Sequence, residues 1–145
     1  MSSVGVNDIL CLKIRYPDGE ISTKNHYYLI TEEIKGEKYV MFEVSQFDSI
    51  NEKNKYLQFE DYISLVKGEV NTCINKDSYI DKRREIKIEK YGDLQKYKVN
   101  NPISIRAIKN ITEDCIKFRA EHNILDINKV SILKDEIESI NGNKE

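Results

Sequence analysis

No stretch of this chain reaches the roughly eighteen consecutive apolar residues that a membrane-spanning helix needs. The Met1-Ser2-Ser3 start also lacks the basic segment and the following apolar segment of a secretory signal peptide. From these two absences we expect a cytoplasmic protein that makes no contact with a membrane.

The cysteines lack any pairing pattern. Cys11, Cys73 and Cys115 are odd in number and far apart, and they show neither CxxC spacing nor a neighbouring histidine cluster. This pattern argues against a disulfide framework and against a zinc site. We interpret the three as small core residues, and we expect no metal and no cofactor.

Neither sign of charge is in large excess, because 23 Lys and Arg residues stand against 25 Asp and Glu residues, for a formal net charge of −2. The chain therefore lacks the overall positive charge typical of a nucleic-acid-binding protein. An RNA-binding surface would need local clustering of cations, and Lys82-Arg83-Arg84 is the densest cluster.

The first half of the chain is patterned as β-structure. Residues 9–16 alternate between two faces, and Pro17-Asp18-Gly19 then supplies turn residues. Residues 26–34 are rich in β-forming side chains, and Lys35-Gly36 leads into a third strand over residues 38–45. The last two strands predict a β-hairpin.

The middle of the chain predicts further short strands, over residues 56–59, 70–74, 84–88 and 95–99, with a helical insertion near residues 60–67. So many short strands within about a hundred residues are typical of a closed barrel. The sequence therefore favours an α+β fold, a small SH3-like antiparallel β-barrel with two C-terminal helices packed on it. We expect one domain, with the barrel over about residues 1–100.

The pattern changes at Asn101-Pro102, a pair typical of a helix start. Apolar residues then recur at three- and four-residue intervals and predict a helix that ends near Asn123. This stripe consists of Ile105, Ile108, Ile111, Cys115 and Phe118. A second stripe, closed by Asn141-Gly142, predicts another helix. It consists of Val130, Leu133, Ile137 and Ile140.

Two stretches resemble known ribonucleases. The run KDSYIDKRREIKI, from Lys76 to Ile88, resembles the Asp-Ser loop and following strand of MazF, which shares its plasmid-toxin barrel with PemK and Kid. The run GEKYVMFEVS, from Gly36 to Ser45, is similar to the hairpin and third strand of ToxN, the ribonuclease of protein–RNA toxin-antitoxin systems. The ToxN and CptN group fits best, over roughly residues 1–90.

The resemblance implies a toxin of phage-defence type and an inhibitory partner, a small RNA folded into pseudoknots, with which the toxin forms a closed oligomer. In ToxN the third strand ends in a catalytic Thr-Ser pair. Here Ser45 matches, Val44 stands at the threonine position, and Phe47 replaces a following lysine. Lys24 lies near the place of a lysine that precedes the second ToxN strand.

Such an enzyme cleaves single-stranded RNA without a metal. The 2′-hydroxyl attacks the adjacent phosphorus and expels the 5′-oxygen, which leaves a 2′,3′-cyclic phosphate. The reaction needs a proton acceptor for the hydroxyl, donors or a cation for the phosphate oxygens, and an acid for the leaving oxygen. DNA lacks the hydroxyl and would be spared.

Four residues are candidates for this chemistry, namely Lys24, His26, Ser45 and Gln46. His26 is one of two histidines, stands at a strand start and suits proton transfer near neutral pH. Lys24 would stabilise the phosphate, and Ser45 and Gln46 would donate hydrogen bonds to its oxygens. Antiparallel pairing places the start of the second strand beside the end of the third, which would bring the four together. Which residue is the base and which the acid stays open.

Residues of two loops are candidates to hold the RNA strand. They are Asp48, Ser49, Lys76, Ser78, Lys82 and Arg83. An ordinary turn explains Asp48 and Ser49 equally well, and a solvated charge run explains the lysines and arginine equally well. The pattern favours core packing for Tyr27 and Tyr28 and stabilisation of a helix end for His122.

Other functions fit the same pattern. A non-catalytic barrel that binds a protein or peptide would need no chemistry at His26. A toxin of the MazF type would take a protein antitoxin. A structural or regulatory phage-type protein would dimerise through its last helix.

Overall fold

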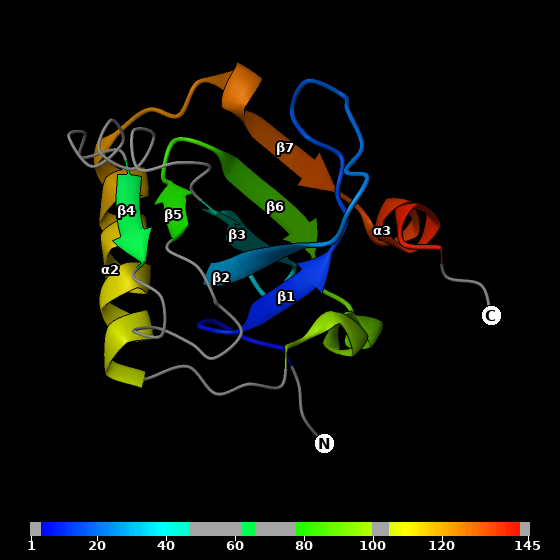
Figure 1. Ribbon diagram of the computed structural model, residues 1–145, viewed down its shortest axis with the longest axis horizontal. Helices are drawn as coiled ribbons and strands as arrows, with labels where there is room; N and C mark the ends of the chain where they lie inside the picture. Colours follow the sequence, from blue (N-terminus) through cyan, green and yellow to red (C-terminus); the bar gives the residue numbers. More distant parts are fainter. Residues whose placement is uncertain (1–3, 47–61, 66–77, 100–104, 143–145) are drawn as a thin grey trace.

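Strand β3 is the centre of the structure and pairs along both of its edges (Figure 1). The computed structural model describes residues 4–46, 62–65, 78–99 and 105–142. Within them, seven strands form one sheet in the order β1-β2-β3-β5-β4, and β6 and β7 also extend from β3. The strands are β1 Ile9–Leu12, β2 His26–Ile34, β3 Lys38–Gln46, β4 Tyr62–Leu65, β5 Ser78–Asp81, β6 Glu85–Glu89 and β7 Lys129–Ile132. The helices are η1 Gly92–Tyr97, α2 Ile105–Glu121, η2 Asp126–Asn128 and α3 Lys134–Ile140.

The predicted hairpin is confirmed, because β2 and β3 pair antiparallel on either side of a tight turn. Lys35 and Gly36 have φ angles of 52° and 70°, and the Glu37 N–H donates to the Ile34 carbonyl at 2.9 Å. Positive φ at both central residues is the geometry of a type I′ turn, whose twist matches that of the flanking strands. The turn therefore sets the register of β2 against β3.

A three-residue bulge separates β5 from β6 on the other edge of β3. The pair Val44–Ile80 belongs to the β3–β5 ladder, and the pair Met41–Ile86 belongs to the β3–β6 ladder. Between these pairs β3 has two residues and the opposite chain has five, so three residues are extra. They are Lys82, Arg83 and Arg84, the cationic cluster of the sequence. Bulges of this kind re-aim side chains and are frequent beside active sites.

Both faces of the sheet are covered by apolar packing. Val40, Phe42 and Val44 of β3 point to one face, where Ile111 and Cys115 of α2 cover them. The opposite face holds a second cluster, to which β1, β2, β3, β6, η1, β7 and α3 contribute. It consists of Leu10, Leu12, Ile14, Tyr28, Ile30, Tyr39, Met41, Ile86, Ile88, Leu94, Val130, Ile132 and Ile137. Two-residue alternation places Glu43 and Ser45 on the face of Tyr39 and Met41, so this face becomes polar toward the end of β3.

The α+β class is confirmed, because a mostly antiparallel sheet is combined with separate helices. Closure of the sheet is not observed in the described part of the chain, where β1, β4 and β7 each pair with one strand only. The sheet also has a feature that an antiparallel barrel lacks, since β6 and β7 pair parallel. The described part of the chain therefore forms an open sheet with helices on both faces, in which one edge of β3 pairs with both β5 and β6.

Three local predictions are wrong. The helical insertion expected near residues 60–67 is replaced by β4, because Tyr62–Leu65 pairs with β5. The strand expected over residues 95–99 is largely replaced by η1. The helix expected from Val130 is preceded by β7, because Val130 and Ile132 are buried at two-residue spacing while Leu133 is 57% exposed.

The first C-terminal helix is confirmed as α2, with Ile111, Cys115 and Phe118 buried. The second ends as predicted, since α3 stops at Ile140 and Gly142 follows with φ 63°. The strands expected over residues 56–59 and 70–74, and the helix start at Asn101-Pro102, lie outside the described residues. None of the helices in the described ranges combines the length and the apolar character that crossing a bilayer requires.

The cysteine interpretation is confirmed for Cys115, which is fully buried between α2 and the sheet. Burial raises the pKa of its thiol to about 12, so the thiol stays protonated and unreactive at neutral pH. Cys11 is partly buried, and burial raises its pKa as well. Cys73 lies outside the described residues.

Charged side chains tie α2 to the sheet. The Arg119 guanidinium donates to Glu85 of β6 at 2.8 Å and to Glu32 of β2 at 3.2 Å. The Lys82 ammonium group lies 3.3 Å from an Asp114 oxygen and 5.0 Å from the centre of the Phe118 ring. These contacts fix the helix against the two strands on either side of β3.

Replacing Arg119 by Met should lower the free energy of unfolding by about 3 kcal/mol, because the nearly inaccessible Glu85 carboxylate loses its hydrogen-bonded partner. The cation that remains near Glu85 is Lys87, whose Nζ lies 3.6 Å from Glu85 Oε2. Urea denaturation followed by circular dichroism measures the change. The double variant R119M/E85Q should recover part of the loss, because it buries no unpaired carboxylate. A loss in the double variant equal to that in the single variant would contradict this explanation.

Candidate active site

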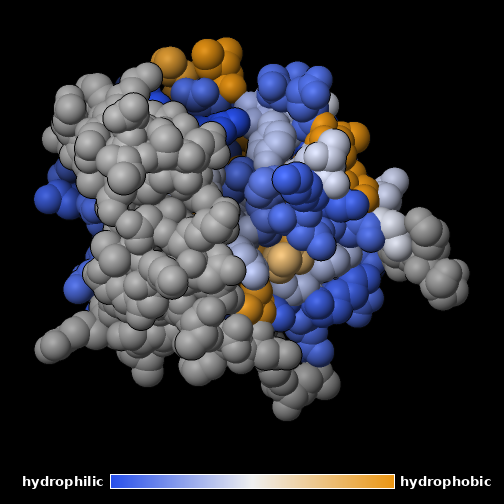
Figure 2. Space-filling view, in the orientation of Figure 1, coloured by the Kyte–Doolittle hydropathy of each residue, from blue (hydrophilic) through white to orange (hydrophobic). Residues whose placement is uncertain are grey.

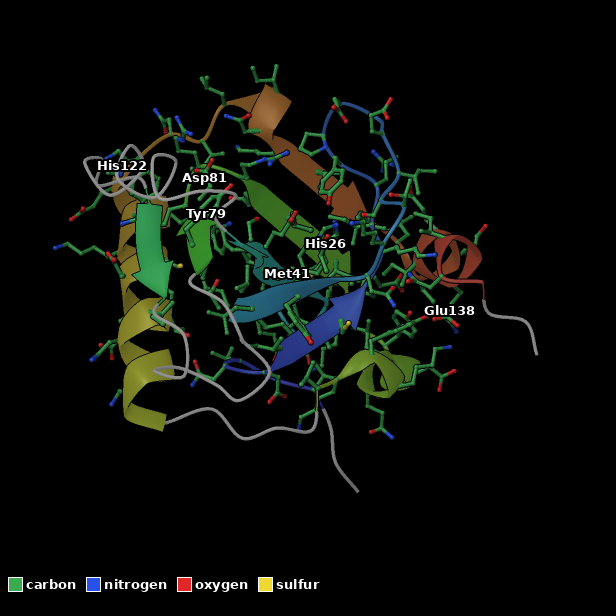
Figure 3. The ribbon with its side chains drawn as sticks, in the orientation of Figure 1. His26, Met41, Tyr79, Asp81, His122 and Glu138 are labelled. Atoms are coloured by element: carbon green, nitrogen blue, oxygen red, sulfur yellow. The ribbon has the colours of Figure 1, made fainter. Side chains whose placement is uncertain are left out.

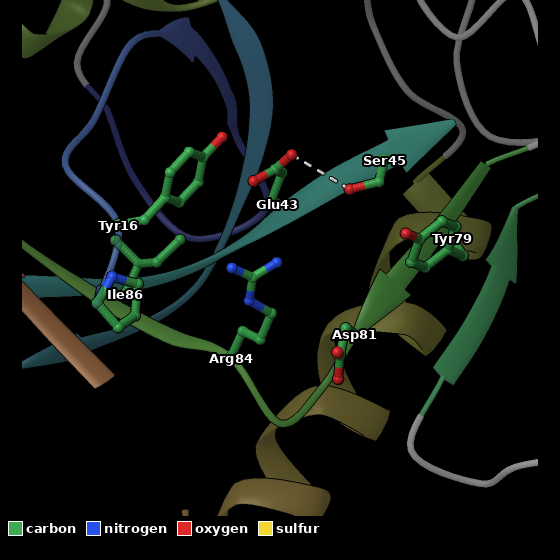
Figure 4. Close-up of a pocket in the computed structure, with 8 residues that line it drawn as sticks. Tyr16, Glu43, Ser45, Tyr79, Asp81, Arg84 and Ile86 are labelled. Atoms are coloured by element: carbon green, nitrogen blue, oxygen red, sulfur yellow. Dashed lines mark hydrogen bonds between the residues drawn. The ribbon is translucent and has the colours of Figure 1, made fainter. Parts of the chain in front are cut away.

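A pocket opens where the polar end of β3 meets the bulge between β5 and β6 (Figure 4). Two carboxylates, one guanidinium and three hydroxyl groups line it together with two apolar side chains. The lining residues are Tyr16, Pro17, Glu43, Ser45, Tyr79, Asp81, Arg84 and Ile86. The pocket therefore combines anionic, cationic and hydrogen-bonding groups.

The Glu43 carboxylate contacts two of the residues that the sequence predicted to be catalytic. The Ser45 hydroxyl donates to Glu43 Oε2 at 3.2 Å, and His26 Nδ1 lies 3.6 Å from the same oxygen. The side chains of Glu43 and His26 are 19% and 35% exposed, so both reach solvent while the sheet restricts them. Two residues that the sequence selected for proton transfer and hydrogen bonding are thus brought together through a carboxylate.

Backbone pairing explains this convergence. The last β2–β3 pair is Tyr27–Val44, and one further step along the two strands sets His26 beside Ser45. Glu43 lies two residues before Ser45, on the same face of β3. The imidazole, the hydroxyl and the carboxylate therefore share one face of two adjacent strands.

Tyr28 lies beside Glu43, as its cross-strand partner on β2. Its ring belongs to the apolar core, and its hydroxyl is buried without a hydrogen-bond partner among the described residues. Burial, with the Glu43 carboxylate as the next cause, raises the pKa of Tyr28 well above its ordinary value. The Tyr28 side chain therefore stays uncharged next to the Glu43 carboxylate.

Arg84 brings the positive charge. It is the last residue of the bulge, and its guanidinium carbon lies 5.7 Å from the centre of the Tyr16 ring. In Figure 4 the guanidinium points to the space between Tyr16 and Glu43. Within residues 4–46, 62–65, 78–99 and 105–142, Arg84 has no ion pair within 4.0 Å, so it remains available to a bound anion.

Arg83, the residue before Arg84 in the bulge, is engaged differently. Arg83 donates to both carboxylate oxygens of Asp81, at 3.0 and 3.1 Å. The Arg83 backbone N–H also donates to Asp81 at 3.0 Å. Tyr79, two residues before Asp81, is the cross-strand partner of Ser45. The wall formed by β5 therefore contributes a hydroxyl group and a neutralised carboxylate.

The other two residues predicted to be catalytic are Lys24 and Gln46. Lys24 is exposed in the segment just before β2 and is not among the residues that line the pocket. Gln46 ends β3 and pairs with Ser78 of β5, and for both only the backbone is described. Asp48, Ser49 and Lys76, predicted to contact RNA, lie outside the described residues.

The structure gives Lys82 a contact that the sequence did not predict. Lys82 is 5% exposed and faces α2 through Asp114 and Phe118, on another side of the sheet from the pocket. Arg83 is exposed and lines a separate pocket with Phe118 and His122 at the end of α2. An RNA contact by either residue stays a prediction.

The interpretations of His122 and Tyr28 are confirmed. His122 Nδ1 lies 3.0 Å from the Phe118 carbonyl, and its ring stacks on Phe118 at a centroid distance of 4.0 Å. Figure 3 shows His122 at the α2 side of the molecule, well apart from His26. Tyr28 is fully buried in the core, as packing requires.

Sequence reasoning missed Glu43 and Arg84. The signal for Glu43 is the alternation Tyr39, Met41, Glu43, in which a carboxylate interrupts an apolar face. Arg84 gives no such signal, because its position depends on how many residues the bulge contains. Across the described ranges, no group of three or more His, Cys, Asp or Glu side chains is arranged to hold a metal ion.

Comparison with models of protein families, with curated proteins and with solved structures finds no match to this chain. Function is therefore inferred from the pocket itself and from the local resemblances of the sequence.

Replacing Tyr28 by Phe should leave the free energy of unfolding unchanged or raise it by about 1 kcal/mol, because it removes a buried hydroxyl that has no partner. The matched variant is Tyr39→Phe, since the Tyr39 hydroxyl donates to the Val4 carbonyl at 2.7 Å. Tyr39→Phe should cost about 1 kcal/mol. Urea denaturation of both variants decides the matter, and equal losses would show that the Tyr28 hydroxyl has a partner.

Proposed function

We propose that this protein is a metal-independent endoribonuclease toxin of the ToxN and CptN type. It cleaves single-stranded RNA by attack of the 2′-hydroxyl on the adjacent phosphorus and leaves a 2′,3′-cyclic phosphate. The observation that carries the proposal is the convergence of His26 and Ser45 on Glu43, a carboxylate that lines one pocket together with Ser45 and Arg84.

The groups of the pocket match the needs of this reaction. A guanidinium binds phosphate oxygens through paired N–H donors and stays charged at any physiological pH. Arg84 therefore binds the scissile phosphate and stabilises the charge that develops on it. The hydroxyl of Tyr79, the cross-strand partner of Ser45, donates a hydrogen bond to the same phosphate, while the Ser45 hydroxyl holds Glu43.

Proton transfer belongs to the pair formed by Glu43 and His26. A carboxylate and an imidazole are side chains that exchange protons near neutral pH. The requirement for a 2′-hydroxyl restricts the reaction to RNA.

The RNA strand continues beyond the pocket along the loops that flank it. Lys24 and Gln46 remain candidates for the reaction itself. The candidates for these contacts remain Asp48, Ser49, Lys76, Ser78, Lys82 and Arg83. The proposal includes the features that the resemblance implies: a small SH3-like barrel, a cytoplasmic location, and inhibition by a pseudoknotted RNA antitoxin with which the toxin forms a closed oligomer.

A second candidate function is the binding of a protein partner, either by a non-catalytic module or by a MazF-type toxin with a protein antitoxin. Figure 2 shows a mostly hydrophilic face with apolar side chains gathered over η2. Leu125 and Ile127, in the connection between α2 and β7, are 63% and 76% exposed. Exposed apolar side chains of this kind favour a protein contact.

Incubation of the purified protein with a single-stranded RNA in excess EDTA tests the proposal. Cleavage with 2′,3′-cyclic phosphate ends is expected, and the all-deoxy oligonucleotide should remain intact. Cleavage that appears only after addition of a divalent metal would contradict the mechanism. The absence of any RNA cleavage, together with specific capture of a protein partner, would favour the second candidate.

Replacing Arg84 by Ala should lower kcat/KM on RNA by about 10²- to 10³-fold, because the transition state loses its phosphate-binding cation. Its matched control is Lys109→Ala, which removes a cation from the exposed surface of α2. The control should cleave RNA at the wild-type rate. Steady-state cleavage of a fluorescent RNA measures both variants, and equal small losses would show that Arg84 acts only through long-range charge.

A further inference from the structure

We infer that Glu43 is the general base of the reaction and that His26 is its general acid. This assignment rests on the proposed ribonuclease function. It says which residue accepts a proton and which residue donates one, a question that the sequence alone left open. It adds to the site a catalytic carboxylate that was not among the residues selected from the sequence.

Glu43 has the position that a base needs. Its carboxylate lines the pocket, and the Ser45 hydroxyl and His26 Nδ1 both face one oxygen, Oε2. The second oxygen, Oε1, has no hydrogen bond or ion pair within the described part of the chain. One oxygen is thus held in place, and the other is available to accept the proton of a 2′-hydroxyl.

The other carboxylate of the pocket is occupied. Both oxygens of Asp81 accept hydrogen bonds from Arg83, and Asp81 Oδ1 also accepts one from the Arg83 backbone. A base at this place would have to break a bidentate contact with a guanidinium. Glu43 is therefore the better base of the two.

His26 has the position that an acid needs. Its Nδ1 faces the Glu43 carboxylate, so Nε2 lies on the opposite side of the ring and is farther from Glu43 than 3.6 Å. The start of β2 lies beside the end of β3, so the base and the acid stand next to each other on adjacent strands. His122, the other histidine, stacks on Phe118 at the end of α2 and is not among the residues that line the pocket.

In this reaction one proton is removed from the 2′-hydroxyl and another is given to the leaving 5′-oxygen. Glu43 takes the proton of the 2′-hydroxyl while the 2′-oxygen forms its bond to phosphorus. The bond between phosphorus and the 5′-oxygen breaks, and the 5′-oxygen takes a proton from the imidazolium of His26. The products are a 2′,3′-cyclic phosphate, a 5′-hydroxyl, a protonated Glu43 and a neutral imidazole, and exchange with water restores both side chains.

The deciding experiment uses RNA in which sulfur replaces the leaving 5′-oxygen. A thiolate leaves without protonation, so this substrate needs the base but no acid. His26→Gln should lose about 10²- to 10⁴-fold in kcat/KM on ordinary RNA and recover the wild-type rate on the sulfur substrate. Glu43→Gln should be defective by a similar factor on both substrates.

Each assignment has its own contrary result. Recovery of Glu43→Gln on the sulfur substrate would remove Glu43 as the base. A defect of His26→Gln that is equal on both substrates would show that His26 only positions Glu43. Failure of the wild-type protein to cleave either RNA would instead refute the ribonuclease proposal, so the two failures are distinguishable.

Matched controls separate chemistry from folding. Glu37→Gln removes a carboxylate at the exposed β2–β3 turn, and His122→Gln removes a histidine that does not line the pocket, so both should cleave like the wild type. Glu43→Asp keeps a carboxylate but draws it back, and it should recover part of the activity that Glu43→Gln loses. Thermal unfolding of every variant shows whether it folds. Cleavage of ordinary RNA at the wild-type rate by a correctly folded Glu43→Gln would overturn the proposal.

Discussion

The three extra residues between β5 and β6 are the constraint on which the site depends. In an uninterrupted strand, successive side chains would alternate between the two faces of the sheet. The bulge breaks this alternation and sends three consecutive cations in three directions. Lys82 turns toward α2, Arg83 turns back onto Asp81, and Arg84 enters the pocket beside Tyr16. A cluster that looks uniform in the sequence thus has three different environments.

The charges around the bulge also hold the helix that covers the sheet. Lys82 contacts Asp114 and Phe118 of α2, and Arg119 of the same helix contacts Glu85, the first residue after the bulge. Buried ion pairs add little net stability, because desolvation opposes their attraction, but a broken pair is costly. Their effect here is to fix where α2 sits on the sheet. The contacts of Lys82 and Glu85 with α2 hold the two ends of this segment on the helix side of the sheet. Arg84, which lies between them, is thereby held at the pocket.

The parts of the fold that the sequence predicted are those that local chemistry determines. Lys35-Gly36 supplied a turn with positive φ, so the β2–β3 pairing and the proximity of His26 and Ser45 followed from the hairpin alone. The position of Arg84 did not follow, because it depends on the register of two strands against a third. Val130 was placed in a helix because its spacing to Ile137 fits a helical period, yet parallel pairing with β6 decides its conformation. Long-range pairing overrides local periodicity in both cases.

The candidate site is also the place where ordinary rules of packing are broken. The Tyr28 hydroxyl is buried without a partner among the described residues, and its cross-strand partner Glu43 is a carboxylate at the point where an apolar face becomes polar. Arg84 is a cation with no ion pair in the same part of the chain. Unsatisfied groups in a native structure concentrate at functional sites, because a group already satisfied by the protein has little to offer a substrate. An anion bound between Arg84 and the hydroxyls of the pocket would complete this arrangement, and this is the reason for proposing a phosphate ester as the substrate class.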